Sequence, residues 1–291
     1  MRILLTGITG QLGQELETIL APLGDVKSVD RHALDLAKPE MIRQVMADVK
    51  PEIVVNASAY TAVDKSESEP DVAMAVNGTG VGILAEETQK LGARLIHVST
   101  DYVFDGTQSH PYQETDPTNP IGVYGKSKLA GEEAIKQVGG DSIILRTAWV
   151  YGVGGKGNFV KTMLRLGGSR EELRVVTDQV GSPTWTKDLA EAIASIIQHS
   201  AESGIYHYTN SGVCSWYDFA LAIFEEAKAL GFPLQVKRVA PITTAEYPTP
   251  AKRPAYSVLS HGKISAVMGI YPPHWRQALR NMLKDYQGVI K

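Results

Sequence analysis

Residues 2–13 read RILLTGITGQLG, an apolar run followed at once by glycines spaced three residues apart. The apolar run predicts a buried β-strand over Arg2–Thr6, and the glycines predict a tight turn that opens a helix. Such a turn lets the backbone approach a pyrophosphate closely, and the free N–H groups at the helix N-terminus attract that anion. The alternative is a glycine-rich turn without a ligand, but its place between strand and helix favours binding. The predicted dinucleotide-binding turn comprises Gly7, Gly10, Gln11, Leu12 and Gly13.

The alternation of strand and helix continues through the first 150 residues. Strands are predicted at Arg2–Thr6, Asp25–Val29, Ile53–Asn56, Arg94–Ser99 and Ser142–Arg146. Segments with helical spacing lie between them at Gln11–Leu20, Pro39–Val49, Val72–Leu91 and Ser127–Gln137. Because the strands are apolar throughout, we expect a parallel sheet covered by helices on both faces. Residues 1–150 are therefore predicted to form an α/β domain with a Rossmann-type, doubly wound parallel sheet.

The pattern changes after about residue 150, where glycine-rich turns and a proline-rich stretch at 241–254 separate less regular elements. Residues Gly204–Thr209 are predicted to return as a strand to the main sheet. Helices are predicted at about Asn158–Leu166, Asp188–Gln198, Trp216–Leu230 and Trp275–Tyr286. We expect residues 151–291 to form mainly a smaller, mixed α/β domain that binds the substrate.

The end of the second predicted strand carries side chains that could select the cofactor. Asp30 lies about 20 residues beyond the glycines, where an acid accepts hydrogen bonds from the adenosine ribose hydroxyls of NADH. Arg31, the next residue, could instead pair with the extra phosphate of NADPH. Because both types are present, the sequence leaves NADH and NADPH open.

Tyr124 and Lys128 are four residues apart at the start of a predicted helix, so they share one helix face. Reduction of a ketone places negative charge on its oxygen, and a phenol can donate the proton that meets it. A nearby ammonium is expected to lower the phenol pKa from its ordinary value of about 10. Thr100 follows the preceding strand and is expected to donate to the carbonyl oxygen. An exposed Tyr–Lys pair is the alternative, but the position beside the predicted nicotinamide pocket favours catalysis.

The composition excludes several classes of protein. A formal net charge of −3 gives no reason to expect binding to nucleic acid or to an anionic membrane. No apolar run approaches the roughly 20 residues that cross a bilayer, and the N-terminal run is too short for a signal peptide. Cys214 is the one cysteine, which excludes an internal disulfide, and the seven histidines show no zinc-site spacing. We therefore predict a cytoplasmic protein and assign no metal site.

Several long motifs, in the same order along nearly the whole chain, resemble the extended short-chain dehydrogenase/reductase family. They are Gly7–Gly13, Asn56–Lys65, Ser99–Gly106, Asn119–Glu132, Arg146–Tyr151, Asp178–Thr184 and Tyr247–Pro254. More narrowly, they resemble the branch that uses NADPH or NADH to reduce the 4-keto group of dTDP-4-dehydro-L-rhamnose, giving dTDP-L-rhamnose. The thymidine nucleotide in this expectation comes from the resemblance alone.

The resemblance also implies individual roles. Lys128 would hold the nicotinamide ribose hydroxyls, beside Tyr124, and Arg253 would meet the diphosphate of the substrate. The remaining cofactor-binding residues would be Asp35 and Leu36 near the adenine, with Ala59, Tyr60 and Thr61 along the cofactor. The residues facing the sugar would be Val63, Thr100, Asp101, Tyr102 and Trp149. Family members are often associated with magnesium and with homodimers, but no carboxylate cluster in the sequence identifies a place for that ion.

Other reactions of this family need different side chains. A 4,6-dehydratase has an Asp–Glu pair after the threonine, whereas here Asp101 is followed by Tyr102, which argues against dehydration. An epimerase needs no new side chain, so the sequence leaves another nucleotide-sugar epimerase or reductase open. A non-catalytic regulatory subunit of the same fold is a further alternative, although it has no need of Thr100, Tyr124 and Lys128 together.

Overall fold

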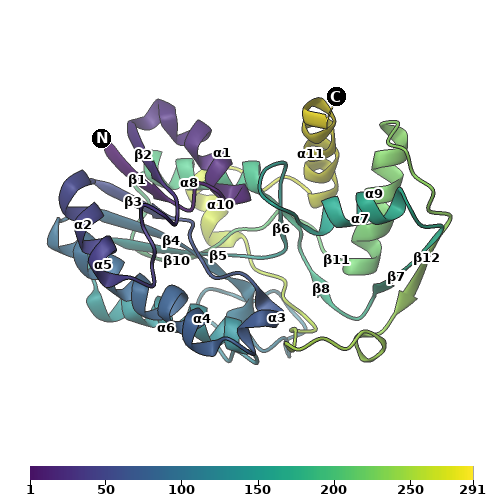
Figure 1. The fold of residues 1–291 in the computed structure, drawn as a ribbon, viewed down its shortest axis with the longest axis horizontal. Helices are drawn as coiled ribbons and strands as arrows, with labels where there is room; N and C mark the ends of the chain where they lie inside the picture. The colour runs from purple at the N-terminus through teal and green to yellow at the C-terminus, as the bar shows by residue number, and fades with distance from the viewer. Residues whose placement is uncertain (291) are drawn as a thin grey trace.

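A six-stranded parallel sheet is the central layer of this computed structural model, which describes residues 1–290 (Figure 1). The strand order is β10-β5-β4-β3-β1-β2, and every neighbouring pair is parallel. The strands are β1 (Arg2–Thr6), β2 (Asp25–Val29), β3 (Ile53–Asn56), β4 (Arg94–Thr100), β5 (Ser142–Thr147) and β10 (Gly204–His207). The predicted Rossmann-type doubly wound sheet is therefore confirmed, including the return of β10 to the edge beside β5.

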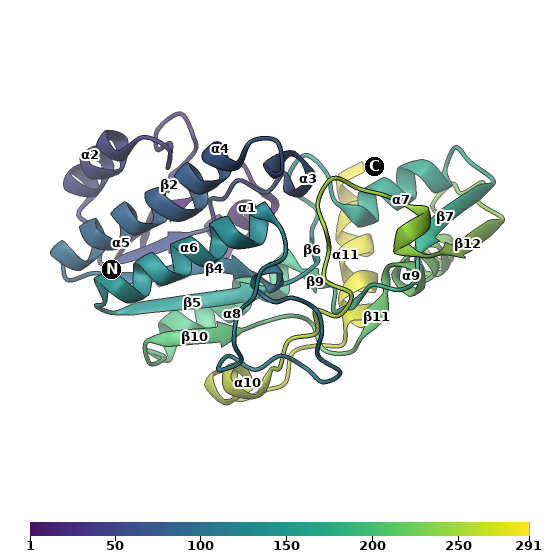
Figure 2. The ribbon, with the colours of Figure 1, turned by 90° about the horizontal axis from the view of Figure 1, so that it is seen from below.

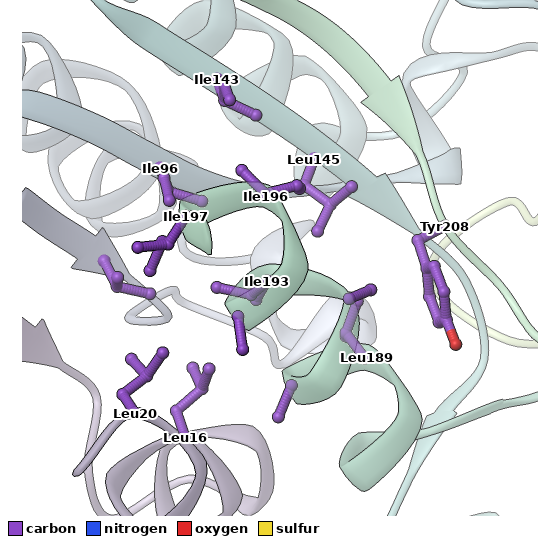
Figure 3. Packing of buried hydrophobic residues seen from close by; sticks show 14 of the residues in the cluster. Leu16, Leu20, Ile96, Ile143, Leu145, Leu189, Ile193, Ile196, Ile197 and Tyr208 are labelled. Atoms are coloured by element: carbon purple, nitrogen blue, oxygen red, sulfur yellow. The ribbon is translucent and has the colours of Figure 1, made fainter. Parts of the chain in front are cut away.

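Successive side chains of the inner strands alternate between two helical layers. Ile3 and Leu5 face one layer, and Leu4 faces the other. The first layer contains α1 (Gln11–Leu20), α8 (Thr186–Gln198) and α10 (Gly262–Met268). The second contains α2 (Pro39–Val49), α5 (Gly80–Lys90) and α6 (Val123–Val138). Figure 3 shows the first layer, where Leu16 and Leu20 of α1 meet Ile193 of α8 over the sheet.

The edge strand β2 departs from the prediction of continuous apolar strands. Its residues Asp25–Val29 alternate between exposed and partly buried, and it pairs only with β1. An edge strand is half solvated, so polar residues such as Lys27 are tolerated there. The position of the strand was predicted correctly, but its burial was not.

The helical region predicted at Val72–Leu91 is interrupted. It consists of α4 (Pro70–Met74), a π-helical segment η2 (Ala75–Thr79) and α5. Helix α6 begins at Val123, four residues before the predicted start, so that Tyr124 and Lys128 both lie within it. A short helix α3 (Val63–Ser66) and the 3-10 turns η1 (Ala21–Leu23) and η3 (Asp101–Val103) complete this part of the chain.

The second part of the molecule lies beside the carboxyl ends of the sheet strands (Figure 1). Its core joins helices α7 (Phe159–Gly167), α9 (Trp216–Ala229) and α11 (Trp275–Ile290) to a parallel pair of strands, β7 (Glu172–Val176) and β12 (Arg238–Ile242). The shorter elements are β6 (Val150–Tyr151), β9 (Thr184–Trp185), β8 (Val180–Gly181), β11 (Cys214–Ser215) and η4 (Thr244–Glu246). Strand β12 was not predicted, because Pro241 and its exposed side chains obscure the pattern.

The chain passes between the two parts more than once. Helix α8, strand β10 and helix α10 all pack with the main sheet, as Figure 2 also shows for β10 beside β5. The substrate-binding role and the boundary at residue 150 remain predictions. Within residues 1–290, none of the helices combines the length and the apolar character needed to span a bilayer.

Candidate active site

A cavity of about 590 Å³ opens where four strands of the sheet end. The chain reverses its direction of travel across the sheet between β1 and β3, and ligands of open α/β sheets bind at such a switch point. The predicted residues that line this cavity are Gly10, Gln11, Leu12, Gly13, Ala59, Thr61, Val63, Thr100, Asp101, Tyr102, Tyr124, Lys128 and Trp149. The glycine turn, the Tyr–Lys pair and most of the residues expected to face the sugar therefore share one site.

The glycine turn requires glycine at two positions. Gly7 has φ +82°, and a Cβ there would lie 2.8 Å from the carbonyl carbon of Ala57. A Cβ on Gly13 would overlap the carbonyl oxygen of Gly7. The backbone N–H of Gly10 donates to that same oxygen at 2.9 Å, and no side chain caps helix α1. The turn thus leaves helix N–H groups facing an open cradle, which suits a pyrophosphate.

A second glycine-rich loop covers this turn. Gln11 donates to the backbone oxygen of Val150 at 3.1 Å and accepts from Asn158 at 3.1 Å. Gly155 and Lys156 line the cavity, and a Cβ on Gly155 would lie 3.0 Å from the Gln11 nitrogen. The predictions did not include Lys156, an exposed cation beside the presumed phosphate position, although the run Gly154–Gly157 was a signal for such a loop.

Four residues predicted on the adenosine side lie outside the cavity lining. Asp30 accepts from the backbone N–H groups of His32 and Ala33 at 2.9 and 3.0 Å, and these bonds hold its pKa below the ordinary value. Arg31 is exposed and contacts Asp35 at 3.2 Å. Leu36 is buried in the layer of α2 and α5, so its side chain is not free to contact an adenine.

Two further predicted residues also lie outside the lining. Gly7 acts through the turn rather than as a wall of the cavity. Tyr60 directs its hydroxyl to Glu69 at 2.7 Å, and its backbone N–H donates to Asn77 at 2.8 Å. Asn77 lies in the π-helical segment and also donates to Ser127 of α6 at 3.0 Å. The side-chain amide of Asn77 therefore links the loop after β3, which carries Tyr60, to helix α6.

Burial raises the pKa of Tyr124 to about 12, although a hydrogen bond with Thr100 lowers it. The prediction that Lys128 lowers this pKa is wrong for the structure as it stands. The amine of Lys128 instead contacts the backbone oxygen of Val98 at 2.7 Å and Nε2 of His97 at 3.1 Å. A phenol with a raised pKa stays protonated at neutral pH, which is the state required of a proton donor.

Lys128 is buried, and this burial lowers its pKa to about 8, while Glu132 one turn further along α6 raises it. Glu132 is itself buried and pairs with Arg146 of β5 at 2.6 Å. Ser99 donates to the same carboxylate at 2.6 Å. The helix face that carries Tyr124 and Lys128 therefore also carries Glu132, whose charge is neutralised by Arg146 below the site.

Thr100 and Asp101 form a polar pair at the end of β4. The Thr100 hydroxyl donates to Oδ1 of Asp101 at 3.0 Å and accepts from the Tyr102 backbone N–H at 3.2 Å. Burial raises the pKa of Asp101 to about 6, and its Oδ2 is buried without a partner within the described residues. The Thr100 hydroxyl has one proton, and while Thr100 donates it to Asp101 it cannot donate it to a substrate oxygen. The predicted role of Thr100 therefore depends on the charge of Asp101.

Aromatic side chains line the part of the cavity in which the sugar is predicted to bind. Tyr102 packs edge-on against Tyr124, with ring centroids 5.4 Å apart. Trp149 has φ +48° and stacks on Trp216 at 3.5 Å between centroids. A non-glycine residue held in the left-handed region is strained, and such strain is concentrated at functional sites. Trp149 lines this cavity, and Trp216 lines a second one, so the stack connects the two linings.

Arg253 lines the second cavity, of about 710 Å³, rather than the first. Its guanidinium donates to Asp64 at 2.8 Å and to the backbone oxygen of Ala251 at 3.0 Å. Arg170 and Arg174 line the same space. The lining also includes Asp64 and Glu172, so the three arginines exceed the carboxylates by one, which favours a phosphate-bearing ligand.

The comparisons with known proteins agree with this geometry. The model of the family described as "RmlD substrate binding domain" matches residues 1–288. The dTDP-4-dehydrorhamnose reductase of Burkholderia thailandensis is 48% identical, over 98% of this chain and 99% of that protein. The enzyme of that name from Escherichia coli K12 is 44% identical, over 98% of each. The chain belongs to the dTDP-4-dehydrorhamnose reductase family.

Solved structures of this family have the same fold. The dTDP-4-dehydrorhamnose reductase of Clostridium acetobutylicum superposes with a TM-score of 0.93 at 41% identity, over 99% of this chain and all of that one. The Bacillus anthracis protein, solved in complex with NADP, has a TM-score of 0.91 at 39% identity, over 98% of this chain and 99% of that one. A UDP-glucose 4-epimerase from Thermus thermophilus has a TM-score of 0.82 at 23% identity, over 99% of each chain, which shows a shared fold.

Membership of the reductase family directs attention to polar residues that the sequence reasoning missed. Asn56, His97 and Glu132 are all fully buried within or beside the sheet, under the cavity. Asn56 and Glu132 lie in the motifs given above and His97 lies in the predicted strand Arg94–Ser99, but a buried polar residue gives no sequence signal of its partner. Across residues 1–290, no group of three or more His, Cys, Asp or Glu side chains is placed to hold a metal ion.

Proposed function

We propose that this chain reduces the 4-keto group of dTDP-4-dehydro-L-rhamnose to give dTDP-L-rhamnose, with NADPH or NADH as the reductant. The observation that carries the proposal is the single cavity shared by the glycine turn and by Thr100, Tyr124 and Lys128. The named relatives support the choice of sugar nucleotide. We further propose, from the composition and the short apolar run at the N-terminus, that the protein acts in the cytoplasm.

The cofactor fits the glycine turn for a steric reason. The pyrophosphate would lie against the N-terminus of α1, where side chains at Gly7 or Gly13 would meet backbone atoms. Lys156 would add a positive charge from the covering loop. Ala59, Thr61 and Lys128 would line the path toward the nicotinamide, which supplies hydride when bound. Arg31 is exposed at the end of β2, where it could pair with the extra phosphate of NADPH.

The protein's part in the chemistry is to hold and deliver a proton. Tyr124 keeps its proton at neutral pH and would give it to the sugar oxygen as charge develops there. Thr100 donates to Asp101 and lies close enough to Tyr124 to lower its pKa, so it would orient the phenol. Val63, Tyr102 and Trp149 would surround the sugar and exclude water from the reacting oxygen.

The nucleotide end of the substrate would occupy the second cavity. Arg253 is predicted to meet the diphosphate, and its present partner Asp64 lies next to Val63 of the first cavity. Binding there would hold the sugar against Tyr124 and raise the effective concentration of the ketone. A homodimer and a magnesium ion are suggested only by the family resemblance, and no residue is assigned to the ion.

The proposal is tested by following the absorbance of NADPH and of NADH with several nucleotide-linked keto-sugars. Stoichiometric cofactor oxidation with dTDP-4-dehydro-L-rhamnose is expected. Conversion of a sugar without net cofactor consumption would show an epimerase instead. A purified, cofactor-binding protein that turns over none of the sugars would point to a regulatory subunit. Light scattering and metal analysis of the same sample would test the homodimer and magnesium.

A further inference from the structure

Four buried polar side chains form a chain under the active site, from β1 through β3 and β4 to helix α6. Thr6 Oγ1 donates to Asn56 Oδ1 at 2.7 Å, and Asn56 Nδ2 contacts His97 Nδ1 at 2.9 Å. His97 Nε2 then contacts Lys128 Nζ at 3.1 Å. Each of the four residues is at most 1% exposed. Buried groups of this kind must match donor to acceptor, because water does not compensate for a mismatch.

The direction of this chain is fixed at Asn56. The backbone N–H of Ser58 donates to Asn56 Oδ1 at 3.1 Å, and a backbone N–H can only donate. The amide oxygen must therefore face Ser58 and Thr6. The amide nitrogen of Asn56, which also can only donate, must face the imidazole of His97.

The amide nitrogen determines where His97 carries its proton. Burial and the neighbouring Lys128 hold the pKa of His97 well below its ordinary value, so the ring is neutral. Nδ1 accepts from Asn56, and a neutral ring then has its proton on Nε2. That N–H points at Lys128 Nζ. An ammonium has only donors, whereas a neutral amine has a lone pair that accepts.

We propose that His97 is a positioning residue for Lys128: Asn56 fixes its tautomer, and its Nε2–H favours the neutral amine of Lys128 over the ammonium. The second contact of the amine, the backbone oxygen of Val98 at 2.7 Å, accepts an N–H in both states and does not discriminate. To charge Lys128, the proton of His97 must move to Nδ1, and the Asn56 amide must turn away from Ser58. Ser58 lies between Ala57 and Ala59, which both line the cofactor cavity.

Other charged or titratable groups near Lys128 do not produce this selectivity. Glu132 favours the ammonium, but Arg146 neutralises that carboxylate at 2.6 Å. The other titratable groups nearby are Tyr124, one turn earlier on the same helix, and Asp101, which directly follows Thr100 at the end of β4. Burial acts in the same direction as His97 and lowers the pKa of Lys128 to about 8. The consequence for turnover, a lysine that gives up its proton more readily than an exposed lysine does, rests on the proposed function.

The tautomer can be measured without substrate. Two-dimensional NMR of the full chain labelled with ¹⁵N-histidine distinguishes protonated from unprotonated ring nitrogens, and the His97→Gln variant assigns the signals. Above the titration midpoint of Lys128, we expect Nε2 to be protonated and Nδ1 to be bare. A proton on Nδ1 under these conditions would overturn the proposal. Asn56→Asp, whose carboxylate accepts from Nδ1–H, should move the proton to Nδ1; a ring that keeps it on Nε2 would also overturn the proposal.

The effect on Lys128 is measured by titrating protein labelled at the lysine side chains, with Lys128→Met for assignment. In His97→Gln the amide can turn its oxygen toward the ammonium without any change of charge. The titration midpoint of Lys128 should therefore rise by about one pH unit, which corresponds to a tenfold smaller acid dissociation constant. Thr6→Val is the matched control, because Ser58 alone keeps the Asn56 amide in place, and it should leave the midpoint unchanged. An unchanged midpoint in His97→Gln, or an equal rise in Thr6→Val, would refute the mechanism.

Discussion

Replacement of Tyr124 by phenylalanine removes one hydroxyl from the cavity and leaves the ring in place. The edge-on contact with Tyr102 depends on the ring, so the variant should keep the shape of the site. The lost group is the proton donor of the proposed reaction. Tyr124→Phe therefore separates the chemical role of this residue from its packing role.

The expected loss of activity is much larger than the expected loss of stability. A positioned general acid contributes about 10²- to 10⁴-fold to the rate, which corresponds to roughly 3–5 kcal/mol of transition-state stabilisation. The hydroxyl lies near Thr100, which lowers its pKa, and a single hydrogen bond of that kind contributes at most about 1 kcal/mol to folding. We expect kcat to fall at least a hundredfold, while the Tm falls by only a few degrees.

The assay is steady-state oxidation of NADPH with dTDP-4-dehydro-L-rhamnose, together with thermal unfolding and cofactor binding for each variant. Tyr206→Phe is the matched control, because its hydroxyl donates to the backbone oxygen of Glu202 at 2.8 Å, away from the cavity. That variant should keep wild-type kcat. If Tyr124→Phe bound cofactor normally and turned over within a few-fold of wild type, the assignment of the proton donor would be wrong.

Three further predictions concern charge. The folded state raises the pKa of Asp101 from 3.8 to about 6, so its contribution to stability is lost as pH rises through this window. Asp101→Asn should therefore stabilise the fold at pH 8 by at most about 3 kcal/mol, seen as a higher Tm, and should stabilise it much less at pH 4. An equal gain in Tm at both pH values would contradict this reasoning. Arg31→Ala should lower kcat/KM for NADPH by roughly tenfold or more and spare NADH, and equal losses with the two cofactors would exclude a phosphate contact. Arg146→Met leaves the buried carboxylate of Glu132 unpaired and should destabilise the fold by about 3–5 kcal/mol in urea unfolding, whereas a loss under 1 kcal/mol would show that water or a proton compensates.

Much of the fold follows from local patterns. The apolar runs predicted all five strands of the first half, with errors of at most one residue at their ends. The prediction failed where burial depends on neighbours: β2 is polar because it lies at an edge, and the paired strands β7 and β12 were not predicted, since both are partly exposed and β12 contains Pro241. A sequence pattern indicates the burial that a side chain favours, whereas the neighbouring strands determine how much of that side chain is shielded from solvent.

The candidate site divides in the same way. The glycines of the turn lie close together in sequence, and Tyr124 and Lys128 lie on one helical turn, so local spacing identified each group. The parallel sheet brings these two groups and Thr100, at the end of β4, to one end of the strands. The surroundings of other predicted residues came from long-range contacts. Leu36 is buried in a helical layer, and Arg253 lines a second cavity beside Asp64.

The sequence by itself determined the strands of the parallel sheet, the glycine turn and the candidate proton donor, because each is identified from residues close together in the chain. Only the tertiary structure decided the protonation of these groups. Segments distant in sequence bury Lys128 and partly cover Tyr124, and His97 of β4 contacts Lys128. A pKa depends on desolvation and on nearby donors and charges, which are set by folding and leave no periodic pattern in the chain.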